Sequence, residues 1–113
     1  MKKINTGSPF SDLETDILNY LWSKGEGRSR TIYLLFGGKH GVTHSTVAVT
    51  LNRLHEKGIL KRKSETARGG VRFVYHPTMT KEELGTDIGY NFLEFLRNTF
   101  GESSIANLKK KLK

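Results

Sequence analysis

The chain has 113 residues, no cysteine and a formal net charge of +8 at pH 7, with 19 Lys and Arg against 11 Asp and Glu. This length fits one small domain with one or two further helices, and the lack of cysteine excludes a disulfide scaffold and any thiolate site. Since there is neither a membrane-length apolar run nor a signal-peptide pattern, we expect a cytoplasmic protein with no membrane partner. The excess of positive charge is typical of proteins that bind polyanions.

The beginning of the chain predicts a helix followed by a short extended stretch. Ser11 and Glu14 have the spacing of a capping box, in which each side chain satisfies the other residue's free backbone N–H. Apolar residues then recur at helical spacing up to Gly25, which suits a left-handed helix end. Residues 27–29 are expected to be extended.

A second helix is expected over residues 30–36, with Ile32, Leu35 and Phe36 directed to the core. The pair Gly37-Gly38 predicts its end, because glycine favours helix termination. Residues 39–42 are therefore expected to form a turn.

The stretch Thr43-His44-Ser45-Thr46 supplies N-cap residues for a third helix, which is expected to run to about Lys57. At about 100° per residue, one stripe of this helix is apolar and is expected to be buried; it consists of Val47, Leu51 and Leu54. The opposite side carries small and polar side chains, flanked by Thr46 and Arg53; it consists of Ser45, Val49, Asn52 and Glu56. One face of the helix therefore holds it in the domain, and the other face is free.

After Gly58 the sequence predicts a β-hairpin. Residues 59–64 lead into a turn near Gly69-Gly70, and Val71, Phe73 and Tyr75 then alternate as in a strand. Between Arg53 and Arg72 there are seven basic residues against two acidic ones. This segment therefore carries most of the net charge of the protein.

The end of the chain predicts a long helix that opens with a second capping box at Thr80 and a short last helix from about Ser103. One side of the long helix is rich in aromatic and aliphatic residues: Leu84, Ile88, Phe92, Phe95, Leu96 and Phe100. Because a winged domain already has its own core, we expect this side to pair with a second copy of the chain. Packing back onto its own domain is the alternative.

These elements follow the order of a winged helix-turn-helix domain, so we expect a mainly α fold with a small antiparallel β-hairpin. Residues 1–78 are expected to form the DNA-binding domain, and residues 79–113 a C-terminal helical dimerisation segment. A major groove about 12 Å wide admits one helix whose outer side chains are small or polar. The expected contacts from the third helix are Thr43, Ser45, Thr46, Val49, Asn52 and Arg53, and those from the wing to the DNA backbone are Arg62, Lys63, Arg68 and Arg72.

The third helix also resembles the recognition helix of the penicillinase repressor (BlaI/MecI-type) family. The resemblance rests on the pattern Thr43-x-x-Thr46-Val47-x-x-x-Leu51-x-Arg53-Leu54-x-x-Lys57-Gly58-x-Leu60, and further similarity extends over about residues 11–108. It implies a homodimer that represses promoters by binding a palindromic operator in double-stranded DNA. By motif position it implies DNA contacts from Ser45, Thr46, Val49 and Arg53, although Val49 stands where the family usually has threonine.

Two other functions fit the same fold pattern. The chain could be a winged-helix module that binds a protein or RNA, since a fold does not fix function, or a regulator of another winged-helix family such as the MarR type. We expect neither catalytic residues nor a cofactor, because no nucleophile, base and acid are arranged together. His40 and His44 are four residues apart, but no third ligand accompanies them, so we expect no metal site. The sequence does not identify an inducer.

Overall fold

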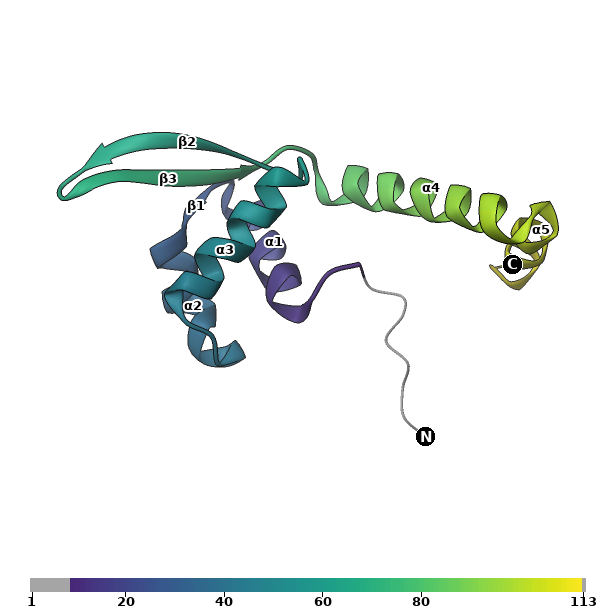
Figure 1. Cartoon of the computed structure of the whole chain (residues 1–113), viewed down its shortest axis with the longest axis horizontal. Coiled ribbons are helices and arrows are strands. Elements are labelled where there is room, and N and C mark those ends of the chain that lie inside the picture. Colours follow the sequence, from purple (N-terminus) through teal and green to yellow (C-terminus); the bar gives the residue numbers. More distant parts are fainter. Residues whose placement is uncertain (1–8, 113) are drawn as a thin grey trace. The chain divides into compact units, whose positions relative to one another are not determined.

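The structure, a computed structural model, describes residues 9–112, which divide into two compact units with a boundary after Met79. Figure 1 shows the order of the elements along the chain. The first unit contains three helices and a three-stranded sheet: α1 (Asp12–Lys24), β1 (Gly27–Arg28), α2 (Ser29–His40), α3 (His44–Glu56), β2 (Leu60–Ala67) and β3 (Gly70–Pro77). The second contains α4 (Lys81–Phe100) and α5 (Glu102–Leu112). This mainly α architecture with an antiparallel hairpin confirms the predicted fold class.

Helix α1 begins and ends where its sequence signals predict. The Ser11 hydroxyl accepts a hydrogen bond from the Glu14 N–H, the Glu14 carboxylate accepts one from the Ser11 N–H, and Gly25 ends the helix at φ 89°. The buried residues of α1 are one face of the core: Leu13, Ile17, Leu18 and Leu21. They pack in the same unit as the fully buried residues Ile32, Val47, Leu51 and Leu54.

Helix α2 does not end at the glycine pair, and in this the sequence prediction was wrong. Gly37 and Gly38 lie inside the helix, which continues to His40 and ends at Gly41 with φ 63°. Gly37 is buried, and a Cβ atom there would come within 2.4 Å of the Tyr33 ring. Glycine is therefore required at position 37 by packing against Tyr33 and not by a helix end.

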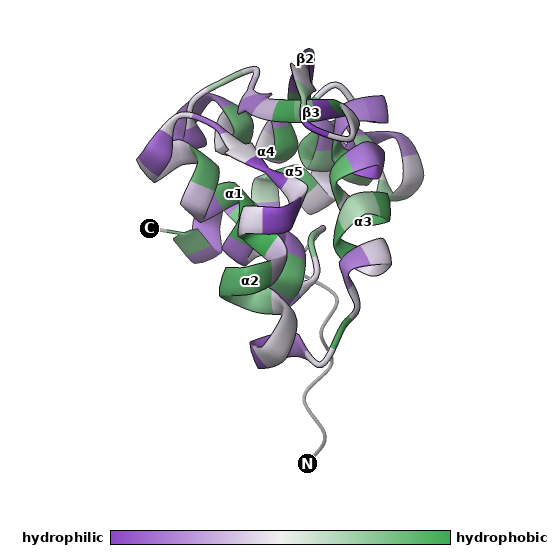
Figure 2. Cartoon of the chain, turned by 90° about the vertical axis from the view of Figure 1, so that its left-hand side faces the viewer, coloured by the Kyte–Doolittle hydropathy of each residue, from purple (hydrophilic) through white to green (hydrophobic). Residues whose placement is uncertain are grey.

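The predicted core of α2 was also partly wrong. Ile32 is fully buried, but Leu35 is 52% exposed and its neighbour Leu34 is 69% exposed. In Figure 2 much of the ribbon of α2 has the colour of hydrophobic residues. Only Ile32 and the half-buried Phe36, whose ring meets that of Tyr20 edge-on, join the core as expected.

The sheet has the strand order β1-β3-β2 and is antiparallel throughout. Strands β2 and β3 pair from Leu60 with Pro77 to Ala67 with Gly70, so the turn is made by Arg68-Gly69. Strand β1 pairs only with Val74 and Tyr75, at the base of the hairpin. The outer part of the hairpin is therefore a two-stranded ribbon, visible in Figure 1; we call this hairpin the wing.

In the described residues of the second unit, α4 and α5 are the secondary-structure elements. Thr80 caps α4 through a capping box with Glu83, as predicted, and Gly101 separates the two helices. Ile105 of α5 is buried, and the Ser104 hydroxyl bonds the Leu96 carbonyl oxygen, so α5 packs on the end of α4. Among residues 9–112 no helix combines the length and the hydropathy needed to cross a membrane.

Candidate nucleic-acid interface

Helix α3 presents one buried and one open face, as its periodicity predicts. Val47, Leu51 and Leu54 have no exposed surface. On the other side Ser45, Thr46 and Arg53 are exposed, together with Val49 at 49%. The four residues recur at helical spacing, so they lie on one side of α3 and are free to meet a ligand.

Thr43 lies at the beginning of α3 and has a structural task. Its hydroxyl accepts a hydrogen bond from the Thr46 N–H at 3.2 Å, and the two hydroxyl groups also lie 3.2 Å apart. This cap satisfies one of the free N–H groups of the helix. Thr43 remains exposed, so capping and a contact to a ligand are compatible.

Asn52 differs from the other predicted contact residues of α3. It is half-buried, and both ends of its amide are already bonded within the protein. The Nδ2 group donates to Glu56 Oε1 at 2.6 Å, and Oδ1 accepts from Arg62 Nη1 of β2 at 2.8 Å. The structure therefore does not leave Asn52 free beside Ser45 and Val49.

The wing carries the predicted basic residues in two different environments. Lys63, Arg68 and Arg72 are exposed, and in Figure 2 the ribbon of β2 is coloured hydrophilic. Arg62 is half-buried instead, and its guanidinium carbon lies 4.2 Å from the centre of the Phe73 ring. The sequence alone gave no sign of this difference.

Strand β1 is joined to the wing by an ion pair. Arg28 Nε donates to Glu65 Oε1 at 2.5 Å. This hydrogen bond, strengthened by the opposite charge, lowers the pKa of Glu65 and raises the pKa of Arg28. The contact links residues 37 positions apart in the sequence, which sequence patterns cannot reveal.

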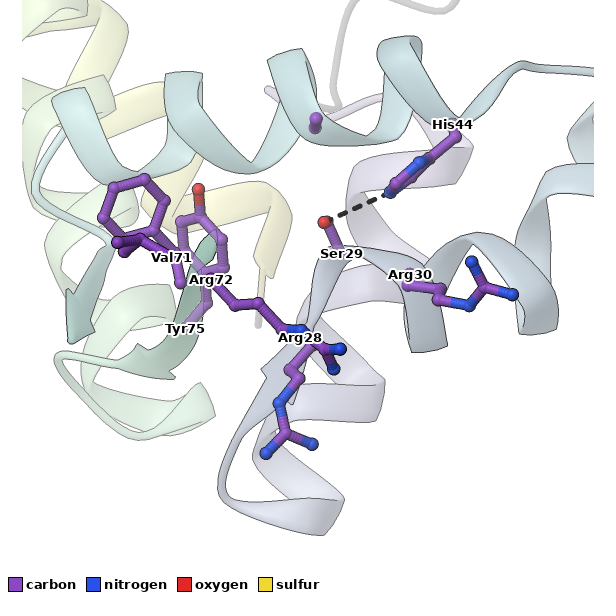
Figure 3. Close-up of a pocket in the computed structure, with 9 residues that line it drawn as sticks. Arg28, Ser29, Arg30, His44, Val71, Arg72 and Tyr75 are labelled. Carbon is purple, nitrogen blue, oxygen red and sulfur yellow. Dashed lines mark hydrogen bonds between the residues drawn. The ribbon is translucent and has the colours of Figure 1, made fainter. Parts of the chain in front are cut away.

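Between α3, the beginning of α2 and β3 lies a pocket of about 380 Å³ that we call the arginine pocket. Its basic residues are Arg28, Arg30 and Arg72, shown in Figure 3. Ser29 and His44 also line the pocket, and the Ser29 hydroxyl lies 3.2 Å from His44 Nε2. The rest of the lining is mainly apolar: Ala48, Val71, Phe73 and Tyr75. Arg28 is already paired with Glu65, so Arg30 and Arg72 are the guanidinium groups left to bind an anion such as a phosphate group.

The sequence patterns assigned no DNA-binding role to Arg28, Arg30 or His44, because the basic segment that they mark begins at Arg53. A usable signal was present: Arg28 and Arg30 flank the beginning of a helix, where the helix dipole favours anions. His40, predicted in a turn, lies in α2, where Nε2 is 2.7 Å from Asp16 Oδ2. Within residues 9–112 no group of three or more potential ligands could hold a metal ion.

The solved structures that resemble this chain include three that cover most of its length. The DNA-binding domain of the repressor BlaI is 26% identical, with 72% of this chain and 90% of that chain covered and a TM-score of 0.51. A possible transcriptional regulator from Methanosarcina mazei Go1 is 16% identical, with 89% and 78% covered and a TM-score of 0.54. Stf76 from the Sulfolobus islandicus plasmid-virus pSSVx is 22% identical, with 68% and 95% covered and a TM-score of 0.50. No curated protein matched the sequence.

A helix with an open polar face, next to a basic β-hairpin on a three-helix core, defines a winged helix-turn-helix DNA-binding protein. The sequence profile of the penicillinase repressor family matches residues 10–113. The chain therefore belongs to the penicillinase repressor family and is a DNA-binding transcriptional repressor, which confirms the resemblance noted in α3. The family is one of transcriptional repressors and not of enzymes.

Proposed function

We propose that the protein represses transcription as a homodimer on a palindromic operator, with α3 of each copy in the major groove. The observation that carries this proposal is the open face of α3 beside the basic wing. A two-fold dimer matches a DNA site with two-fold symmetry, because each copy meets an equivalent half-site. Since its ligand is genomic DNA, we place the protein in the cytoplasm.

Each exposed residue of α3 has a role that follows from its chemistry. The hydroxyl groups of Ser45 and Thr46 donate to or accept from base edges, and Val49 meets a thymine methyl group. Arg53, further along the same side, binds a phosphate group at the edge of the groove. Thr43 caps the helix and meets the DNA backbone at its N-terminus.

The wing and the arginine pocket supply the remaining contacts to the backbone. Lys63, Arg68 and Arg72 are exposed on the wing, and Arg30 is exposed in the arginine pocket. These cations bind phosphate groups whatever the base sequence, so they give affinity and register and not specificity.

Dimerisation through α4 is supported by an exposed row of aromatic rings. Phe92 is 53% exposed, Phe95 54% and Phe100 63%. The three rings follow one another along α4. The ring centroids of Phe92 and Phe95 are 6.3 Å apart, and those of Phe95 and Phe100 are 6.2 Å apart. Such an apolar surface needs a partner, and a second copy presents the same surface. Leu84 is only 6% exposed in the single chain, so it stabilises the protomer and adds little to this interface.

Selection of bound fragments from a genomic library tests the proposal. We expect fragments that share one palindromic sequence, whose affinity falls steeply with increasing salt concentration. Val49→Asp places a negative charge on the open face of α3 and should abolish this binding. Leu35→Asp, at an apolar residue of similar exposure on α2, is the matched control and should bind like the wild type. Failure of the wild type to retain any duplex DNA would refute the proposal.

A further inference from the structure

Four side chains from α3 and the wing form one continuous chain of contacts. Glu56 accepts from the amide of Asn52, Asn52 accepts from Arg62, and the guanidinium group of Arg62 lies over the ring of Phe73. The contacts join α3 to β2 and then to β3. We call Asn52, Arg62 and Phe73 the brace.

The register of the wing explains why Arg62 takes part and its neighbour does not. Successive residues of a strand point to opposite faces. Arg62 pairs with Tyr75 and Ser64 pairs with Phe73, so Arg62 and Phe73 share the face of the sheet that carries the contact to α3. Lys63 points to the other face and is exposed, and its side chain forms no hydrogen bond or ion pair with any described residue.

We propose that Asn52 and Arg62 are positioning residues: with Phe73 they hold the wing at a fixed place beside the recognition helix. Arg62 is therefore not a phosphate contact, and Asn52 is not a base reader. The inference rests on the proposed function and replaces the roles that the sequence predicted for these two residues.

The chemistry of both side chains supports this assignment. To read adenine in bidentate fashion, asparagine must turn Oδ1 and Nδ2 together to the base edge, and in the structure each of these atoms already bonds a protein partner that fixes the amide. The planar guanidinium group of arginine can donate hydrogen bonds along its edge and stack on an aromatic ring with its face at the same time. Arg62 does both, and movement to a phosphate group would break the two contacts together.

A fixed wing matters because α3 and the wing must meet the same duplex. If the wing moved freely, its cations would lose conformational freedom on binding, and affinity would fall. The brace already fixes the wing in the free protein, so this conformational freedom is not lost on DNA binding. Its effect therefore applies to every DNA sequence, whereas a base reader acts on the operator alone.

The test compares Arg62→Lys, Arg62→Ala, Asn52→Ala and the double variant Asn52→Ala/Arg62→Ala, with Lys63→Ala as matched control. The full-length proteins are titrated with the selected operator and with a random duplex over a range of salt concentrations, and circular dichroism verifies that each is folded. Lysine keeps the charge of Arg62 but cannot both stack as a plane and bond Asn52, so it separates the two roles.

If the brace positions the wing, Arg62→Lys should weaken binding as much as Arg62→Ala, by about 3- to 10-fold, the size of one net hydrogen bond. Asn52→Ala should weaken binding to the operator and the random duplex equally, and the double variant should be no weaker than either single one. Lys63→Ala should instead lower the salt slope by about one.

The proposal is overturned if Arg62→Lys binds like the wild type while Arg62→Ala lowers the salt slope as Lys63→Ala does. It is also overturned if Asn52→Ala affects the operator alone. Should the wild type bind neither duplex, the proposed function itself fails, and that outcome is distinct from the two others.

Discussion

The exposed aromatic row of α4 allows a quantitative test of dimerisation through Phe92→Asp. Phenylalanine buries about 150–250 Å² when it is fully covered, and Phe92 is 53% exposed, so a partner can cover about 100 Å² of it. At about 25 cal/mol per Å² this area is worth about 2.5 kcal/mol per protomer, or about 5 kcal/mol per dimer. These values assume complete coverage and are upper bounds.

If only half of this surface is covered, the loss is still about 2.5 kcal/mol, and the dimer dissociation constant should rise by at least about 50-fold. Aspartate adds to the loss, because in a two-fold interface each new carboxylate meets the equivalent surface of the other copy. Phe92→Asp should therefore be monomeric at micromolar concentration and should bind the operator weakly.

Sedimentation velocity over a range of concentrations measures the effect. Tyr90→Asp is the matched control. Tyr90 is 63% exposed, but it is two residues from Phe92 and therefore lies on nearly the opposite side of α4. The Tyr90→Asp variant should remain dimeric. A monomeric wild type, or equal dissociation of both variants, would refute the reasoning.

Three further predictions concern the first unit. Arg53→Ala and Arg68→Ala should each weaken binding to the operator and to random DNA alike and reduce the salt slope by about one, as measured by titration at several salt concentrations. Leu51→Ala should lower the free energy of unfolding by about 2–5 kcal/mol, whereas Val49→Ala should change it by less than about 0.5 kcal/mol, as urea denaturation can show. Hydrogen bonds from Lys39, and to a lesser extent from His40, lower the pKa of Asp16. The ionised carboxylate therefore stabilises the folded protein at pH values above its ordinary pKa of 3.8. This stabilisation is lost as the pH falls through the lower pKa of the folded state. Asp16→Asn should therefore destabilise the protein at neutral pH and reduce the pH dependence of its urea midpoint in acid; an unchanged midpoint at every pH would contradict this.

Local patterns in the sequence were enough to predict most helices and the buried side of α3. Capping boxes at Ser11 and Thr80 depend on residues three positions apart, and the stripe that ends at Leu54 depends on helical spacing. The predicted end of α2 was wrong, because glycine can also occur inside a helix where packing leaves no room for a side chain. At Gly37 the requirement came from the Tyr33 ring.

The parts of the site that could not be predicted depend on contacts between separate elements. The hydrogen bond from Arg62 to Asn52 and the ion pair of Arg28 with Glu65 each join a strand to another element. Sequence composition marks such residues only as polar or charged. It therefore assigned Arg62 and Lys63 the same role, although the register places them on opposite faces of the wing.

Gly37 also connects the interior of α2 with the DNA-binding face. The Tyr33 ring that fills the space beside Gly37 packs against the His44 ring at 5.5 Å between centroids, and His44 is the first residue of α3. A methyl group at position 37 would displace Tyr33 and thereby the support of His44. Substitutions at this buried glycine can thus alter operator affinity without touching DNA, and variation there offers a route to tune repression while every DNA-contacting residue stays the same.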